Sequence, residues 1–483
     1  MRKAEGGQVS PHVSYSRRRA ADRRVGDRGT GQAHIGRMSE TYDLILRGGT
    51  VVTPGGEMQA DIGVRGERIV RIGDLSDASA GEIYGASGLH ILPGVIDSQV
   101  HFREPGLEYK ADLESEARSA ALGGVVAVFE MPNTNPATTT PELLQDKLNR
   151  AAGRMDVDHA FYAGATHENI DILPEMERML GCCGVKVFMG ASTGDLLIKD
   201  DEGVEAVLRV IKRRAAFHSE DEYRLEERRK LAVEGDWTSH PVVRDVEAAV
   251  SSTTRLLRLA RKVGKRIHVL HISTAEEMEI LRDAKDIASV ECLPQHLTLT
   301  APECYERLKG YAQMNPPIRE KRHQDAIWRA LNAGIVDVMG SDHAPHTKEE
   351  KARPYPASPS GMPGVQTTVP IMLTHVNNGK LSLQRFVELT SAGPQRVFGL
   401  ADKGRIAEGY HADFTVVDMK RKETITTEWS KAKCGWTPFD GFEATGWPVA
   451  TIIRGSFVMR DGEIVQKGGG KPVRFNETLE PMA

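Results

Sequence analysis

The sequence has 483 residues, of which 40% are hydrophobic, and a formal net charge of −4 from 63 Lys and Arg against 67 Asp and Glu. This balance excludes a surface built mainly to bind nucleic acid or anionic membrane, because either would need a basic excess. Five cysteines in so long a chain supply no disulfide framework and fit a reducing compartment. No apolar run approaches the roughly 20 residues that span a bilayer. We expect a soluble cytoplasmic protein that binds neither nucleic acid nor membrane.

The first 37 residues differ in composition from the rest of the chain. They hold nine basic and three acidic residues, a charge of +6, so the remaining residues carry −10. This segment, 1–37, is rich in Arg, Gly and Ser and lacks the apolar core of a secretory signal, and we expect it to be disordered. Two origins stay open for it: an organelle transit peptide or, as we prefer, an over-long reading frame with its true start at Met38.

The body of the chain opens with strand patterns and then alternates between strands and helices. Short strands separated by turns that contain Gly are expected at 42–46, 50–53, 61–65 and 68–72. Eight apolar runs that alternate with helical stretches follow, at 91–97, 125–130, 159–163, 185–189, 215–218, 267–272, 289–293 and 336–340. Such runs indicate a parallel sheet covered on both faces, and eight of them over about 250 residues fit a (β/α)8 barrel.

The last part of the chain returns to strand patterns, at 413–417, 451–453 and 457–459. We therefore expect an α/β fold in which a TIM-like (β/α)8 barrel occupies residues 91–400. The two ends of the body, 38–90 and 401–483, should meet in one small β-sandwich domain.

Polar residues follow several of the expected barrel strands, at the ends where barrels of this type place their active sites. His101 follows strand one, His218 ends strand five, His271 ends strand six and Asp342 follows strand eight. Any one of these histidines alone would be an ordinary packed residue. Three imidazoles and a carboxylate at one rim instead indicate a transition-metal site.

Lys186 lies inside the apolar run of strand four. A buried amine is costly unless it is neutralised or paired, so a salt bridge is one interpretation. The other is reaction with carbon dioxide, which makes an anionic carbamate whose two oxygens can bridge two metal ions. Its strand faces the other expected ligands, which favours the carbamate.

These motifs resemble the amidohydrolase superfamily of metal-dependent hydrolases and, within it, the dihydroorotases, over residues 42–460. In that family strand one supplies two His ligands, a carboxylated Lys on strand four bridges the metals, and strands five and six each supply a His. The strand-eight Asp is both a ligand and the proton shuttle. The resemblance implies one or two zinc ions held by His101, N6-carboxylated Lys186, His218, His271 and Asp342, with Asp342 catalytic.

The chain departs from the family pattern at Gln99, where the family has the first His of its pair. An amide oxygen is a weaker zinc ligand than imidazole, so the first metal position is expected to be loosely held, empty or rearranged. One zinc is still enough to lower the pKa of a bound water to about 7. The departure also leaves open a second hypothesis, a non-catalytic relative that scaffolds another enzyme.

The substrate is argued from residues outside the metal motif. Arg103 follows His101 by two positions, where its guanidinium would hold a carboxylate through paired hydrogen bonds. By resemblance, the substrate residues of the dihydroorotases correspond to Arg103, Asn133, Asn315 and His346, with backbone contacts from Pro363 and Gly364. Hydantoin and allantoin hydrolases share the metal motif and stay as alternatives, although their substrates lack the ring carboxylate that Arg103 would bind.

The resemblance implies reversible hydrolysis of (S)-dihydroorotate to N-carbamoyl-L-aspartate, a step of pyrimidine synthesis. Asp342 would carry the proton from the attacking water to the departing ring nitrogen. The expected partner is therefore a small anion, although the body of the chain is itself acidic. We also expect a homodimer or a higher homo-oligomer.

Overall fold

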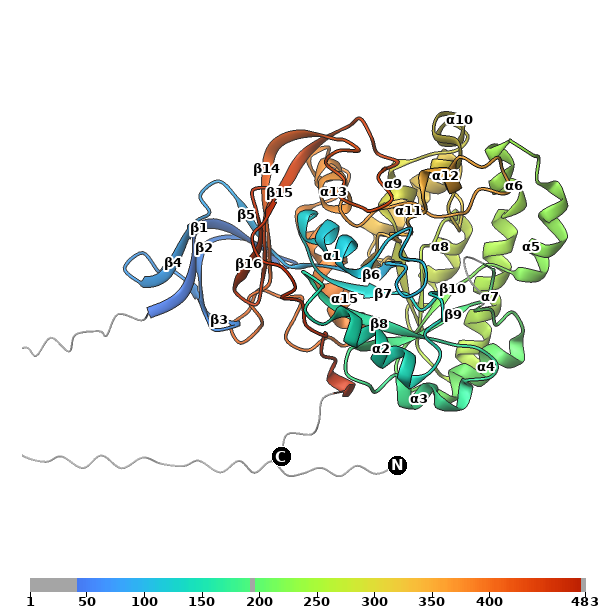
Figure 1. Ribbon diagram of the computed structural model, residues 1–483, viewed down its shortest axis with the longest axis horizontal. Helices are drawn as coiled ribbons and strands as arrows, with labels where there is room; N and C mark the ends of the chain where they lie inside the picture. Colours follow the sequence, from blue (N-terminus) through green and yellow to red (C-terminus); the bar gives the residue numbers. More distant parts are fainter. Residues whose placement is uncertain (1–40, 192–195, 479–483) are drawn as a thin grey trace, which may run out of the picture. The chain divides into compact units, whose positions relative to one another are not determined.

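The computed structural model describes residues 41–191 and 196–478, and within these ranges eight parallel strands form the expected barrel (Figure 1). Neighbouring strands pair in chain order; Ala216 of β10, for example, lies opposite Lys186 of β9. The ring closes where Val100, at the end of the first strand, bridges His343 beyond the last. His101 N–H donates to the His343 carbonyl there at 2.7 Å. The barrel strands are β6 Val95–Val100, β7 Val125–Glu130, β8 Asp158–Gly164, β9 Cys182–Phe188, β10 Ala215–His218, β11 Ile267–Val269, β12 Ala288–Cys292 and β13 Val338–Met339.

Helices follow the barrel strands in the chain, and polar residues cap their ends. In α7, Val246–Val263, the Asp245 side chain accepts from Ala248 N–H at 3.1 Å, and Gly264 ends the helix at φ +72°. The helices and the barrel strands share one apolar core. Across the described ranges, no helix is both long enough and apolar enough to cross a bilayer. The other α-helices are α1 Leu113–Leu122, α2 Pro141–Ala151, α3 Leu173–Met176, α4 Asp201–Val210, α5 Glu222–Arg228, α6 His240–Val243, α8 Ala275–Arg282, α9 Pro294–Thr298, α10 Glu303–Leu308, α11 Lys321–Asn332, α12 Lys348–Lys351, α13 Thr368–Asn377, α14 Leu383–Val387 and α15 Gly393–Phe398.

Segments from both ends of the described chain form a second sheet, which confirms the expected β domain. Its nine strands, counted over the described residues, run in the order β17-β16-β15-β14-β5-β1-β2-β3, with β4 beside β1. The two ends join where Leu92 of β5 pairs with Thr415 of β14. The sheet then curls back on itself, since Arg68 of β3 bridges His411 just before β14. Its strands are β1 Thr41–Thr53, β2 Gly56–Arg65, β3 Arg68–Gly73, β4 Ser79–Gly85, β5 His90–Pro93, β14 Phe414–Ile425, β15 Phe442–Ile453, β16 Ser456–Arg460 and β17 Glu463–Ile464.

The first expected barrel strand is two strands in the structure. The expectation of one strand over 91–97 is wrong, because β5 belongs to the sheet of the β domain and the barrel begins with β6. Gly94 lies at the break, where its N–H donates to the Asp413 carbonyl at 2.9 Å. A Cβ at this position would come within 2.5 Å of the Val126 side chain, so residue 94 must be a glycine where the chain passes from one sheet to the other.

A buried ion cluster ties the barrel to the β domain. Asp158, at the start of β8, pairs with Lys403 at 2.6 Å and with Arg454. Lys403 also pairs with Asp413 at 2.6 Å. Burial alone would raise the pKa of Asp158, but the two cations hold it below its ordinary value. The carboxylate is therefore charged at neutral pH and supplies part of the compensation of each cation, since Lys403 also pairs with Asp413 and Arg454 with Glu67 at 3.5 Å.

Asp158→Asn should lower the free energy of unfolding at pH 7 by about 3 kcal/mol, because Lys403 and Arg454 each lose one of their two carboxylate partners. Urea titration measures the loss, and Asp77→Asn, at an exposed site, is the matched control, expected within about 0.5 kcal/mol of wild type. Folding lowers the pKa of Asp158, so its contribution is present above the unfolded pKa and is lost as the pH falls through the folded pKa. Equal stability of variant and wild type at pH 7 would show that the cluster does not stabilise the fold.

Candidate metal and substrate site

The expected metal ligands lie at the C-terminal ends of the parallel strands, on one rim of the barrel. His101 directly follows β6, Lys186 lies near the end of β9, and His218 is the last residue of β10. His271 and Asp342 lie shortly beyond β11 and β13. All five are at most 7% exposed. The strand topology thus gathers residues from 101 to 342 at the end of the barrel where catalytic groups of this fold are found.

On one side of the rim, His101 and Asp342 face each other, with Nε2 and Oδ1 3.2 Å apart. His101 Nδ1 lies 2.7 Å from Asn133 Oδ1, which can only accept, so Nδ1 carries the proton and Nε2 presents a lone pair. Gln99 donates from its Nε2 to the same Asp342 oxygen at 3.1 Å. The residue that stands where the family has a His is therefore in contact with the expected acid–base group.

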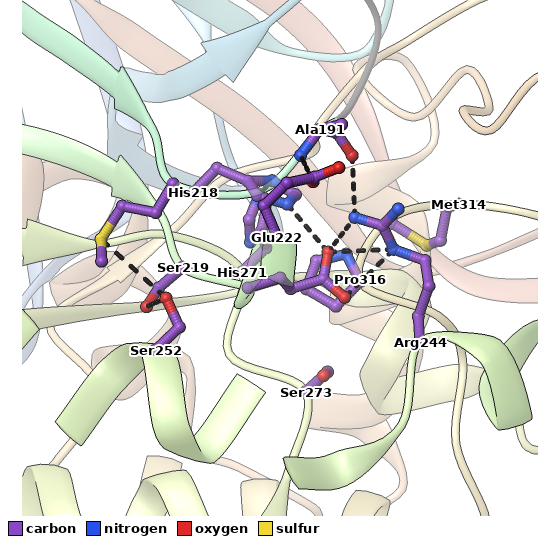
Figure 2. A network of polar contacts seen from close by, with 12 residues as sticks. Ala191, His218, Ser219, Glu222, Arg244, Ser252, His271, Ser273, Met314 and Pro316 are labelled. Atoms are coloured by element: carbon purple, nitrogen blue, oxygen red, sulfur yellow. Dashed lines mark hydrogen bonds and ion pairs between the residues drawn. The ribbon is translucent and has the colours of Figure 1, made fainter. Parts of the chain in front are cut away.

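On the other side of the rim, His218 and His271 form a second pair (Figure 2). His218 Nδ1 lies 3.1 Å from His271 Nε2, and His218 Nε2 lies 2.8 Å from the Glu220 carboxylate. Glu220 is in turn paired with Arg244. A carboxylate on the outer nitrogen of a liganding His fixes the ring and makes the inner nitrogen more basic. The pair therefore brings His218 Nδ1 and His271 Nε2 together, where one cation could contact both nitrogens.

Lys186 brings a buried amine to this rim. Its Nζ has no hydrogen-bond partner among the described residues and lies 4.4 Å from the centre of the Phe188 ring. Burial lowers the pKa of Lys186 to about 7, while Asp342 and Glu291 act in the opposite direction. The salt bridge that was one interpretation of this lysine is not formed within the described residues.

The histidines of the rim are held neutral by burial, which lowers the pKa of His101, His218 and His271. A neutral imidazole is the form that offers a lone pair to a metal. The backbone at two of the expected ligands is strained as well, with φ of +39° at His271 and +43° at Asp342. Non-glycine residues seldom adopt such angles, and those that do concentrate at functional sites.

The donors of this rim fit a divalent transition metal in their chemistry. Within residues 41–191 and 196–478, no three His, Cys, Asp or Glu side chains gather closely enough to enclose an ion. However, Gln99 Oε1, Lys186 Nζ and His271 Nδ1 are buried there with no hydrogen-bond partner in the described chain. Each such atom costs about 1–3 kcal/mol if it stays unpaired. Imidazole nitrogen and carboxylate oxygen are ligands that zinc accepts, so the residues that could hold a metal are His101, Lys186, His218, His271 and Asp342.

A buried arginine lies on the same rim. Arg103 is 1% exposed and has φ +67°; its Nε donates to the Pro345 carbonyl at 3.1 Å, and its Nη2 lies 3.2 Å from His346 Nε2. Nη1 has no acceptor among the described residues. Burial lowers the pKa of Arg103 to about 10, against the opposing effect of Asp342, so the guanidinium is charged at neutral pH. The rim thus holds a buried positive charge with a donor left for an anionic ligand.

A sequence model of the amidohydrolase family matches residues 90–458. The chain belongs to the amidohydrolase family. A dihydroorotase of Halobacterium salinarum is 36% identical over 425 residues, which cover 86% of this chain and 96% of the relative. An L-hydantoinase of Paenarthrobacter aurescens is 32% identical over 450 residues, 89% of this chain and 97% of the relative. The solved structure of an L-hydantoinase (dihydropyrimidinase) from Arthrobacter aurescens superposes with a TM-score of 0.86 at 30% identity, over 89% of this chain and 99% of that one. The resemblance stated from the sequence and the expected hydrolase class are confirmed.

The other expected substrate residues of this amidohydrolase lie at several points of the rim. Asn133 contacts His101, and His346 contacts Arg103. Asn315 lines a cavity of about 510 Å³, and its Oδ1 has no hydrogen-bond partner in the described ranges. Pro363 and Gly364 are buried, and the Gly364 N–H is taken up by His343 Nδ1 at 3.1 Å.

Three buried acids escaped the sequence analysis although each supports the amidohydrolase rim. Glu220 holds His218. Glu291 of β12 accepts from the His271 N–H at 3.3 Å, and Asp97 of β6 accepts from the Ser341 N–H at 3.0 Å. They hold the segments on which the expected ligands lie. For Asp97 and Glu291 an acid inside an apolar strand was the available signal, the same one that singled out Lys186, whereas Glu220 lies two residues beyond β10 and carried no such signal.

Proposed function

We propose that this amidohydrolase is a zinc-dependent dihydroorotase, which hydrolyses (S)-dihydroorotate reversibly to N-carbamoyl-L-aspartate in pyrimidine synthesis. The observation that carries the proposal is Arg103, a buried charged side chain whose Nη1 has no acceptor among the described residues. A carboxylate on the substrate ring would supply that acceptor, and a guanidinium binds carboxylates through paired hydrogen bonds. The similarity to a dihydroorotase over 86% of the chain supports the same substrate.

The residues of the rim have different roles in the proposed reaction. Zinc held by the histidines, Lys186 and Asp342 would supply Lewis-acid polarisation of the ring carbonyl and a water of lowered pKa. Asp342 receives a proton from the attacking water and delivers it to the ring nitrogen that leaves. Its Oδ1 accepts from Gln99 Nε2 at 3.1 Å, which keeps the carboxylate in place for both transfers. Arg103 holds the substrate carboxylate, and a displacement of about 1 Å would cost about a hundredfold in rate.

Lys186 would join the metal ligands as a carbamate. Its unpaired neutral amine attacks carbon dioxide: an N–C bond forms as one C=O π bond breaks, and the nitrogen releases one proton to water. The product is an anion, whereas the unmodified amine would compete with the cation that the rim is to hold. Modification therefore converts a buried, unpartnered group into one with a function.

Two other functions compete with this proposal. Hydantoin hydrolysis is favoured by the structural similarity to an L-hydantoinase at a TM-score of 0.86. A non-catalytic scaffold is favoured by Gln99 alone. One experiment distinguishes the three functions. The purified protein with added zinc is assayed on dihydroorotate, dihydrouracil, hydantoin and allantoin, and its metal content is measured. We expect bound metal and preferred turnover of dihydroorotate; preferred turnover of hydantoin would support the second function, and neither metal nor turnover the third.

Arg103→Gln should lower kcat/KM for dihydroorotate by about 100-fold or more, because the charged partner of the ring carboxylate is lost. The kcat/KM for dihydrouracil, which has the same ring without a carboxylate, should change little. Arg68→Gln, at a half-exposed ion pair of the β domain, is the matched control and should change neither value. A loss of equal size on both rings would mean that Arg103 supports the barrel and does not select the substrate.

A further inference from the structure

A second cavity lies at the opposite end of the barrel strands from the candidate site. Its volume is about 320 Å³. Residues 212–214 line it and directly precede β10, whose other end is His218. Residues 264–266 line it as well and precede β11, which leads to His271. The cavity is therefore separated from the proposed chemistry by the length of the strands, and nothing in the proposed reaction uses it.

The walls of this cavity are strongly basic. Six cationic residues line it against one acid, Glu477: Lys212, Arg213, Arg214, Lys265, Arg266 and Arg396. Glu477 pairs with Arg213 at 3.3 Å, and Arg396 pairs with Glu388 at 2.7 Å. Within the part of the chain that the structure describes, the remaining four cations form no ion pair. The body of the chain is acidic overall, so this concentration of uncompensated positive charge is local.

Arg214 is the cation of this cavity that has a buried donor unpaired within the described residues. Its Nη1 donates to Ser289 Oγ at 3.1 Å and to the Val397 carbonyl at 3.4 Å. Its Nε is buried and has no acceptor in the described residues. Burial and the neighbouring charge of Arg266 both disfavour the charged form of Arg214. An unpaired donor and a like-charged neighbour are costs that a bound anion would remove.

We propose that this basic cavity binds a small phosphate-bearing anion with at least two negative charges. Arginine forks match phosphate oxygens bidentately, and here they come from different strand starts together with lysines as point charges. The volume is that of a small-ligand pocket. The ligand is an inorganic phosphate or diphosphate, or the phosphate part of a nucleotide.

Calorimetric titration of the full chain with pyrophosphate, inorganic phosphate and a nucleoside triphosphate tests this proposal. We expect one site per chain and tighter binding of pyrophosphate than of phosphate. Repeating the titration in the presence of a chelator excludes a contribution from metal at the other end of the barrel. Tighter binding of the nucleotide than of pyrophosphate assigns the site to nucleotides, and equal binding assigns it to the free phosphates. Absence of binding at millimolar concentration would overturn the proposal.

The variant for this test reverses two exposed cations of the cavity, Lys212→Glu with Arg266→Glu. Both side chains are solvent-exposed, so folding should be unaffected. Binding of pyrophosphate should weaken at least tenfold. Arg71→Glu with Lys420→Glu changes the net charge equally at exposed positions of the β domain and should leave binding within twofold. Equal weakening in both double variants would assign the effect to bulk charge and overturn the cavity as the site.

Discussion

Asp342→Asn should reduce dihydroorotate hydrolysis by about 1,000-fold or more while the substrate still binds. An amide cannot accept the proton of the attacking water, and acid–base catalysis by one positioned group is worth about 10²–10⁴-fold. The shape is preserved, and the amide oxygen can still accept from Gln99, so the barrel should fold normally. The measurement is kcat by a continuous assay, with substrate affinity by calorimetry on the same preparation.

The control for this experiment is Asp402→Asn. Asp402 pairs with Arg68 at 3.1 Å in a half-exposed ion pair of the β domain, so the change is chemically identical and distant from the rim. Its turnover should match that of wild type. Metal content distinguishes two causes of a low rate in Asp342→Asn: a loss with metal retained places Asp342 in proton transfer, whereas a loss with metal absent places it among the ligands. Wild-type turnover would remove Asp342 from the mechanism.

Lys186→Met should abolish activity and yet leave the metal-free protein as stable as wild type or more stable. Methionine has a similar length and buries no donor, whereas Lys186 buries an amine with no hydrogen-bond partner among the described residues. Removing such a group recovers about 1–3 kcal/mol. Activity is lost because no carbamate can form. Residues that lower stability in this way are retained for function.

Lys147→Met provides the contrast, since Lys147 is a buried lysine that is fully paired. It forms an ion pair with Glu130 and donates to the Met131 carbonyl at 3.0 Å. Removing it leaves Glu130 uncompensated and should cost about 3–5 kcal/mol. Urea titration of both variants in the presence of a chelator gives the comparison. A large destabilisation by Lys186→Met, or retained turnover, would contradict the assigned role of Lys186.

Much of the barrel could be predicted because its strands are local patterns. A run such as that of β7 is apolar on both faces and is bounded by helical stretches, so its existence follows from nearby residues alone. The boundary at Gly94 could not be predicted, because β5 is defined by its pairing with Thr415, more than 300 positions along the chain. Pro93 and Gly94 mark an interruption of the apolar run, but they carry no sign that its halves belong to different sheets.

The site was predictable to the extent that it depends on strand ends. His101, His218 and Asp342 follow from the rule that the C-terminal ends of barrel strands meet at one rim. The acids that support them were not predicted, because Glu220 and Glu291 acquire their roles only through three-dimensional contacts. The same holds for His343, which lies in a metal-like motif but is held by Glu116 at 2.8 Å and by the N–H groups of 364 and 365.

The closure of the barrel has a thermodynamic consequence. The seam between the first and last strands includes the bridge from Val100 to His343, and His101 and Asp342 lie directly beside it. A cation bound by both His101 and Asp342 would link the first and last strands, so the free energy of its binding would add to the free energy of folding. At a free concentration 100 times its dissociation constant, such an ion adds about 2.7 kcal/mol to the stability of the whole barrel. The metal concentration would then determine the folded fraction of this protein as well as its catalytic rate.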